Sequence, residues 1–182
     1  MLKTLRFLFI LFFIISSFTH PQKNKLKIDS SKSLPILTVE SLSNAQYRVG
    51  NYLNLIRLYD GAYVYPMGKQ YSDRDFYIIY DRQTYCKLDG DDLIDAIVIL
   101  WEKFGGSEYW PYIVPVLNKN GVPYSLKSFP LPDRTEIKRI YKKNSIIYLE
   151  LVVHDKDAPP FYRSKNETWK LKLEKNEFLR ID

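Results

Sequence analysis

This sequence contains very little cysteine and histidine. Its one cysteine, Cys86, cannot form a disulfide within the chain, so a disulfide-stapled scaffold is excluded. Its two histidines, His20 and His154, are too few for a zinc site built from several imidazoles. In an oxidising compartment, the single thiol is best explained as a small buried apolar side chain, with pairing to a second chain as the alternative.

The domain also lacks an excess of positive charge. The whole sequence has a formal net charge of +6, but residues 33–182 contain 21 basic and 20 acidic residues, a difference of +1. The remaining positive charge lies in residues 1–32. Nucleic-acid-binding domains concentrate lysine and arginine on their own surface, because neutralisation of phosphates provides most of their affinity. We therefore predict no nucleic-acid partner.

The only long apolar run lies at the N-terminus. Two cations precede the continuous apolar residues 7–15, and small hydroxyl residues follow them. This order is typical of a secretory signal peptide, and the run is shorter than the roughly 20 residues of a membrane-spanning helix. We predict a signal peptide at residues 1–19, a flexible tether at 20–37 and a single domain at 38–182. The expected location is periplasmic or extracellular, with membrane contact only if the N-terminal segment stays uncleaved.

Aromatic residues are abundant, with 15 Tyr, 10 Phe and 3 Trp, which indicates a folded core. Short β-branched and aromatic runs alternate with turn residues about every 8–12 positions. This pattern predicts a mainly β fold, an antiparallel meander or small sandwich with one short N-terminal helix. Thr38 is expected to cap that helix over residues 39–45, and the continuously apolar run Ala96–Trp101 predicts a central strand buried on both faces. The expected strands are 52–65 with a turn at Asp60-Gly61, 76–80, 96–101, 109–117, 123–129, 137–141, 146–153, 169–173 and 178–181.

Four carboxylates lie within seven residues, just before the central strand, at Asp89, Asp91, Asp92 and Asp95. Acidic residues at alternate positions around a glycine, with another four residues on, are typical of a calcium loop. Asp89 and Asp91 would be side-chain ligands, and Asp95 would close the loop. Lys87 stands where such a loop usually has its first ligand, and its charge opposes a cation. The alternative is a solvated turn whose Asp side chains bond their own backbone. Both interpretations stay open, and calcium is the one cofactor that the sequence suggests.

Several short segments occur in an order that resembles a known family. They are 42–47 (LSNAQY), 60–63 (DGAY), 88–100, 105–107 (GGS), 112–118 (YIVPVLN) and 121–123 (GVP). The segments resemble a family of small exported bacterial proteins, many of them lipoproteins, whose function is uncharacterised. In that family a D-L-N-G-D-G-x-x-D-A loop, similar to the calcium loops of FG-GAP-type β-propeller blades, leads into an apolar strand. The resemblance implies export and a loop of this type, but no reaction.

This sequence departs from the family pattern at three points. Lys87 replaces the first acidic residue of the loop, and Asp92 replaces its second glycine. The cysteine that would carry a lipid is missing after the apolar run. The first departure bears on metal binding, and the last bears on lipid anchoring.

A second candidate site is the aromatic segment 104–112, where two glycines precede Tyr109, Trp110 and Tyr112. Exposed tyrosine and tryptophan beside a flexible loop are often used to hold a sugar ring or a protein partner. The alternative is a hairpin whose aromatic side chains pack on alternate faces of the sheet. On the first interpretation, the partner is a protein or a glycan of the cell envelope.

No catalytic constellation stands out in the sequence. His154 precedes Asp155 and Asp157 and could serve as a base or metal ligand, but no recognisable nucleophile motif accompanies it. We therefore predict an exported, non-catalytic binding domain that calcium stabilises if the loop binds it. One alternative is an inhibitor- or immunity-type protein for an exported enzyme. Another is a metal-assisted hydrolase using His154 and the three loop carboxylates, which requires them to lie within about 10 Å of one another.

Overall fold

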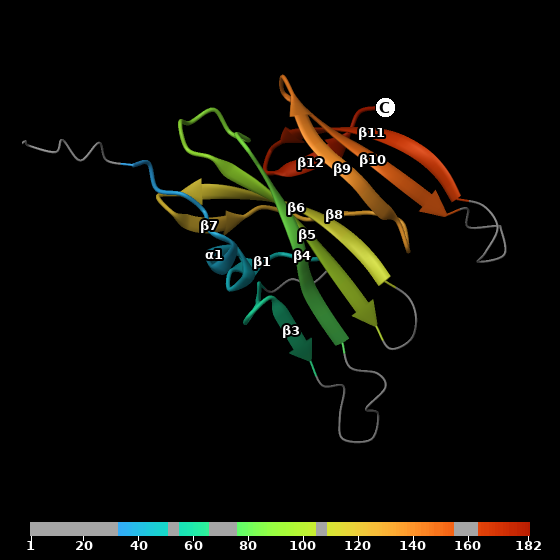
Figure 1. Cartoon of the computed structure of the whole chain (residues 1–182), viewed down its shortest axis with the longest axis horizontal. Helices are drawn as coiled ribbons and strands as arrows, with labels where there is room; N and C mark the ends of the chain where they lie inside the picture. Colours follow the sequence, from blue (N-terminus) through green and yellow to red (C-terminus); the bar gives the residue numbers. More distant parts are fainter. Residues whose placement is uncertain (1–32, 51–54, 66–75, 105–108, 155–163) are drawn as a thin grey trace, which may run out of the picture. The chain divides into compact units, whose positions relative to one another are not determined.

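The computed structural model describes residues 33–50, 55–65, 76–104, 109–154 and 164–182. Within the compact unit Leu34–Asp182, antiparallel strands dominate and one short helix lies at the start, as the sequence predicts (Figure 1). The predicted signal peptide and most of the predicted tether lie outside the described residues. The elements are α1 (Val39–Ser43), β1 (Gln46–Tyr47), β2 (Ile56–Arg57), β3 (Ala62–Tyr65), β4 (Phe76–Cys86), β5 (Asp95–Phe104), β6 (Tyr109–Lys119), β7 (Val122–Ser125), β8 (Phe129–Pro130), β9 (Glu136–Lys143), β10 (Ile146–His154), β11 (Ser164–Glu174) and β12 (Glu177–Arg180).

The helix α1 begins at its predicted cap. The Thr38 hydroxyl accepts the Ser41 N–H at 3.0 Å, and the Ser41 hydroxyl accepts the Thr38 N–H at 2.9 Å, which makes a capping box. Leu42 on this helix is fully buried. Its carbonyl accepts the Tyr47 hydroxyl at 2.6 Å. Burial raises the pKa of Tyr47 above its ordinary range, so the phenol stays protonated and keeps this bond.

Six strands form the central sheet. Its order is β3-β4-β5-β6-β7, and β8 pairs with the same edge of β6 as β7 does. Along β5, the side chains of Ala96, Val98 and Leu100 belong to one core cluster, while those of Ile97 and Ile99 belong to another. The prediction of a strand buried on both faces is therefore confirmed for residues 96–100.

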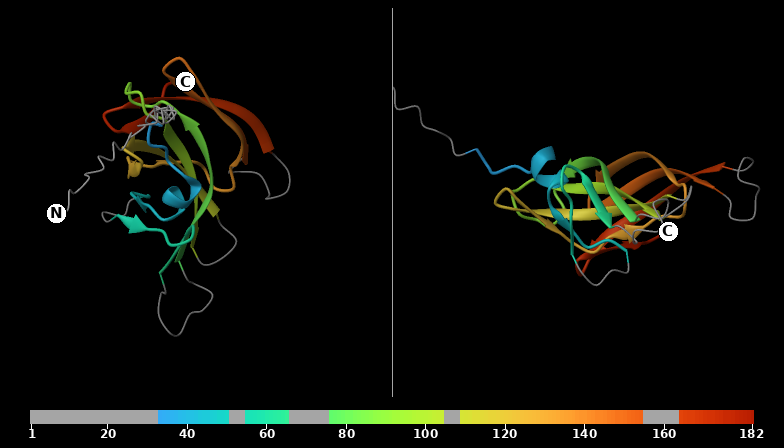
Figure 2. Two further views of the ribbon diagram at one scale, coloured as in Figure 1. Left: turned by 60° about the vertical axis from the view of Figure 1, so that its left-hand side comes forward. Right: turned by 90° about the horizontal axis from the view of Figure 1, so that it is seen from below.

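Each face of the central sheet has its own cover. On one side, α1, β1 and β2 contribute Leu42, Tyr47 and Ile56 to the first core. On the other side, the four-stranded sheet β12-β11-β10-β9 contributes Leu149 and Leu171, among others, to the second core. Figure 2 shows the blue and cyan segments on one side of the green and yellow strands and the orange and red strands on the other. The predicted sandwich is thus present, with a further thin layer over its outer face.

Tight turns connect many of the strands, and several need a left-handed backbone. Asn120 and Gly121, at φ 56° and 86°, join β6 to β7, as their sequence predicts. Asp60 and Gly61 also turn the chain. The strands that flank Asp60-Gly61 then separate, because β2 pairs with β1 whereas β3 pairs with β4.

One strand is much longer than predicted. The sequence indicates a strand at residues 76–80, whereas β4 continues to Cys86 and pairs along all of β5. A register shift between Tyr80 and Arg82 lets the polar second half follow the partner strand. Cys86 is half-buried against the second core, and this burial raises the pKa of its thiol to about 11 despite the opposing charge of Lys142. The thiol is therefore protonated at neutral pH, in agreement with its apolar interpretation.

Among the described residues, no helix has the length and apolar character required to span a bilayer.

Candidate functional sites

The three loop carboxylates predicted to lie together do so. Asp89 and Asp91 lie in the connection between β4 and β5, Asp95 is the first residue of β5, and each offers an oxygen within 4.8 Å of the others. Asp95 is fully buried, whereas Asp89 is half-buried and Asp91 is exposed. The side chains therefore differ in what they can do.

Asp95 acts as an internal anchor. One carboxylate oxygen accepts the Leu88 N–H at 2.6 Å, and the other accepts the Asn118 N–H at 2.8 Å. The Asn118 side chain continues this network, because its amide donates to the carbonyls of Ile94 at 3.1 Å and Pro35 at 2.8 Å. These bonds fasten the start of the acidic loop to the end of β6.

Asp89 and Asp91 form turns with their own backbone. Asp89 Oδ1 accepts the Asp91 N–H at 3.2 Å, and Asp91 Oδ1 accepts the Leu93 N–H at 2.9 Å. The Lys119 ammonium lies 3.2 Å from Asp89 Oδ2. Partial burial raises the pKa of Asp89, but the Asp91 N–H and the Lys119 charge outweigh it and hold this pKa below its ordinary value. Gly90, at φ 133°, provides the backbone bend between the two turns.

Hydrogen bonds that the loop carboxylates already accept limit the oxygens that they could offer to a metal ion. Five of the six oxygens of Asp89, Asp91 and Asp95 already accept a hydrogen bond, one of them from an ammonium group. A calcium ion takes 6–8 oxygen ligands and would have to compete with Lys119 for Asp89. Lys87 pairs with Asp92 at 3.3 Å instead of pointing its charge at the cluster. The donor set thus fits the self-bonded turn better than a calcium cage.

The aromatic segment divides between two faces of the central sheet. Tyr112 is only 9% exposed and belongs to the first core, and the half-buried Trp110 packs against that same core. Tyr109 is 39% exposed and lies on the opposite face, because successive side chains of a strand alternate. Of the three aromatic residues singled out in the sequence, Tyr109 is the one available to a ligand. The two glycines that precede them lie outside the described residues.

Tyr109 lines a shallow apolar groove of about 430 Å³ with Ile79, Trp101 and Arg134. The rings of Trp101 and Tyr109 stand nearly perpendicular, at 81°, with centroids 6.5 Å apart. Ile79 and Trp101 are directly paired on β4 and β5, so their side chains share one face. We call this surface, formed by Ile79, Trp101, Tyr109 and Arg134, the aromatic groove.

Charged groups surround the aromatic groove without filling it. The Lys103 ammonium lies 5.4 Å from the centre of the Tyr109 ring. Arg134 pairs with Asp133 at 3.2 Å, and Asp133 also accepts the Tyr109 N–H at 3.2 Å. The groove therefore has apolar walls and a polar rim, the usual composition of a small-ligand site.

Three of the four groove residues, Ile79, Trp101 and Arg134, were not predicted from the sequence to be site residues. Trp101 ends the apolar run predicted to be buried on both faces, and Ile79 lies in a predicted strand, so both are expected in a core. Arg134 lies in a turn and has a φ of 56°. Its own N–H donates to the Tyr109 carbonyl at 3.0 Å, which places it at the groove. One indication was available in the sequence. Trp101 is the last residue of the apolar run, where burial beneath the covering sheet is expected to end.

His154 does not join the acidic loop. It is the last residue of β10 and pairs with Ser164 on β11. The loop lies near the other end of β10, because Lys142, which pairs with Ile147, donates from its ammonium to the Lys87 carbonyl. The seven residue-to-residue steps of strand from 147 to 154 span roughly 23 Å. This separation removes the constellation that a hydrolase built on His154 and the three carboxylates would need.

No protein-family model matches the chain, and neither the curated proteins nor the solved structures contain a significant match to it.

Proposed function

We propose that this protein is an exported, non-catalytic binding domain and that the aromatic groove is its ligand site. The observation that carries the proposal is the corner formed by the half-buried Trp101 and the exposed Tyr109, whose rings line one groove together with the exposed Ile79. Aromatic and apolar side chains that line a groove with charged groups at its rim form a surface that a ligand can use.

The groove suits a glycan better than a protein partner. A volume of about 430 Å³ accommodates a short oligosaccharide segment. A stable protein interface needs roughly 800 Å² from each partner, far more than four side chains provide. A sugar ring has an apolar face that can lie on Tyr109 or Trp101 and hydroxyl groups that can bond Arg134 at the rim. We therefore take a neutral or weakly acidic envelope glycan as the ligand.

The acidic loop supports this domain as a rigid turn. Asp95 ties the loop to β6, the strand that also carries Tyr109. In this proposal Lys119 provides the positive charge next to Asp89, and calcium is not needed to hold the loop.

The test is binding of the full chain to an array of bacterial envelope oligosaccharides. Native protein is expected to retain at least one glycan, and Tyr109→Ala is expected to weaken that binding at least about tenfold, because aromatic contacts contribute about 0.5–1.5 kcal/mol beyond the area they bury. Tyr85→Ala is the matched control: Tyr85 is similarly exposed, at 43%, and lies near the opposite end of β4.

Two results would overturn the proposal. One is failure of the native protein to retain any glycan on the array. The other is equal binding by native protein and Tyr109→Ala. If the protein instead forms a stoichiometric complex with an exported enzyme and inhibits it, the inhibitor alternative replaces the glycan-binding function.

A further inference from the structure

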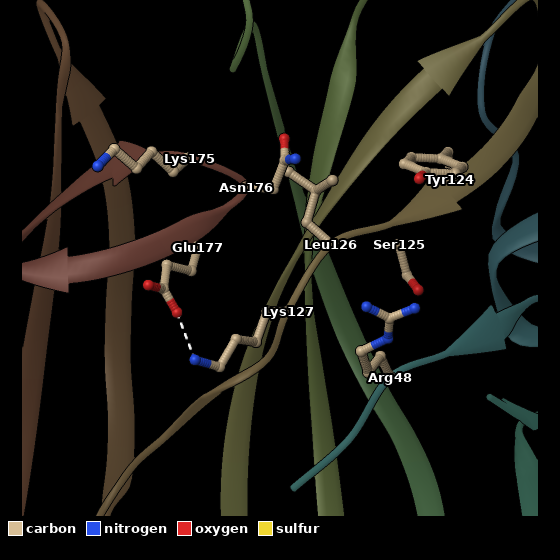
Figure 3. A pocket seen from close by; sticks show the side chains of 8 residues that line it. All are labelled: Arg48, Tyr124, Ser125, Leu126, Lys127, Lys175, Asn176 and Glu177. Carbon is tan, nitrogen blue, oxygen red and sulfur yellow. Dashed lines mark hydrogen bonds and ion pairs between the residues drawn. The ribbon is translucent and has the colours of Figure 1, made fainter. Parts of the chain in front are cut away.

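A second pocket lies away from the aromatic groove and shares no lining residue with it. Its volume is about 290 Å³, and three separate parts of the chain form it. Arg48 follows β1, residues 124–127 end β7 and lead toward β8, and residues 175–177 comprise the turn between β11 and β12 and the first residue of β12. Figure 3 shows these residues around the pocket.

Backbone hydrogen bonds fix the walls of this pocket. Arg48 and Lys127 form an isolated parallel bridge. The Ser128 N–H donates to the Arg48 carbonyl at 3.3 Å, and the Lys127 N–H donates to the Asn176 carbonyl at 3.2 Å. The Ser128 hydroxyl in turn accepts the Gly50 N–H at 3.0 Å. The segments are therefore held together by main-chain contacts, independently of the charged side chains that they present.

The lining has an excess of positive charge. It contains the cations Arg48, Lys127 and Lys175 and a single carboxylate, Glu177, which leaves a net charge of +2. Glu177 is paired with Lys127. The guanidinium of Arg48 and the ammonium of Lys175 have no ion-pair partner in the described part of the chain. Because residues 33–182 as a whole carry only +1, this pocket is a local concentration of positive charge.

An unsatisfied hydroxyl lies in the same pocket. The Ser125 Oγ is buried and has no hydrogen-bond partner among the residues that the structure describes. In Figure 3 it points toward the Arg48 guanidinium, whereas Lys127 and Lys175 extend to the other side of the pocket. Leaving a buried polar group unpaired is unfavourable by about 1–3 kcal/mol. An acceptor atom placed between Ser125 and Arg48 would satisfy the hydroxyl and the guanidinium together.

We infer that this pocket binds the phosphate group of a small phosphomonoester, with Arg48 and Ser125 as its main donors. A guanidinium presents a planar set of N–H groups that matches two oxygens of a phosphate. A phosphomonoester carries close to two negative charges at neutral pH, which matches the net +2 of the lining. Tyr124, which is 57% exposed, also lines the pocket and is available to the group that carries the phosphate.

Calorimetric titration of the full chain at constant ionic strength tests this site. The probes are inorganic phosphate, glucose 1-phosphate and glucuronate, with sodium chloride as the ionic control. Both phosphates are expected to bind with saturation below about 10 mM, and glucose 1-phosphate is expected to bind more tightly. Equal affinities for the two phosphates would assign the site to free phosphate instead of an ester. Tighter binding of glucuronate than of either phosphate would overturn the phosphate assignment.

Three variants separate a binding role from a structural one. Arg48→Met is expected to weaken phosphate binding at least about tenfold. Ser125→Ala is expected to weaken it severalfold while leaving the free energy of unfolding unchanged or slightly raised, because it removes an unpaired buried hydroxyl. Arg57→Met is the control, since it removes an exposed arginine from β2, the neighbour of β1.

The inference fails if phosphate produces no more heat than chloride at matched ionic strength. It also fails if Arg48→Met binds phosphate as well as Arg57→Met does. The result does not depend on the glycan function, because Tyr109→Ala alters the aromatic groove and is expected to leave phosphate affinity unchanged.

Discussion

At the scale of single residues, Asp95 shows how one side chain can serve two segments of backbone. Its two oxygens accept the N–H groups of Leu88 and Asn118, and no part of the residue is exposed. Asp95→Asn keeps the shape but points an amide N–H₂ at one of these donors. We expect a loss of about 2–3 kcal/mol in the free energy of unfolding, because a buried N–H then has no acceptor.

Urea denaturation of the full chain measures this loss, and the same loop provides the control. Asp92→Asn makes the same chemical change at a side chain that is 94% exposed, so its effect should stay below about 0.5 kcal/mol. Similar losses for the two variants would mean that Asp95 is not the anchor that its hydrogen bonds indicate.

At the scale of elements, β10 has two different faces. Ile147, Leu149 and Leu151 are buried in the second core, while Tyr148 lies on the outer face and stacks on Tyr141 with ring centroids 5.1 Å apart. We expect Leu149→Ala to lower the free energy of unfolding by about 2–5 kcal/mol, because it leaves a cavity. Tyr148→Ala should lower it by less than about 1 kcal/mol, since it removes one cross-strand contact.

Chemical denaturation of both variants makes this comparison. The two positions are adjacent in sequence and share the same partner strands, so position along the sheet is controlled. Equal losses would contradict the assignment of one covered and one open face to β10.

An element could be predicted from sequence where neighbouring residues determine it, and was missed where contacts with distant residues determine it. The helix cap at Thr38 and the turn at Asn120-Gly121 are local patterns, and both are confirmed. The second half of β4 was missed because residues 81–86 are mostly polar and become a strand only through pairing with β5. Of the groove residues, the sequence singled out Tyr109 alone, because the position of Trp101 at the border of the second core depends on how the two sheets pack.

At the scale of the whole molecule, the two proposed ligand sites draw on different elements. Strands β4, β5 and β6 provide Ile79, Trp101 and Tyr109 to the aromatic groove. The proposed phosphate pocket instead forms where β1, β7 and the turn between β11 and β12 meet. A pocket assembled from separate segments in this way cannot be recognised from a pattern along the sequence. Arg48, Ser125 and Lys175 are unremarkable in the sequence, and only the fold brings them together.

The stability of the whole chain also tests the calcium hypothesis. A thermal melt of the full chain is measured in EDTA and in millimolar calcium. We expect the two midpoints to agree within about 1 °C, because Lys119 and backbone N–H groups already occupy five of the six loop oxygens. Binding at a hundredfold excess over Kd would instead add about 2.7 kcal/mol and raise the midpoint by several degrees. Such a rise, abolished by Asp91→Ala, would establish the loop as a calcium site.

If calcium leaves the midpoint of the native protein unchanged, Lys119→Met distinguishes two explanations. Either the Lys119 ammonium competes with calcium, or the loop geometry itself prevents calcium binding. The substitution removes the ammonium beside Asp89 and leaves its carboxylate without a counter-charge. We expect this variant to lose less than about 1 kcal/mol of stability, because the ion pair is partly exposed. If Lys119 occupies the place of a cation, calcium should raise the midpoint of the variant but not of the native protein. A variant that also ignores calcium would show that the loop geometry itself, and not competition by Lys119, prevents metal binding.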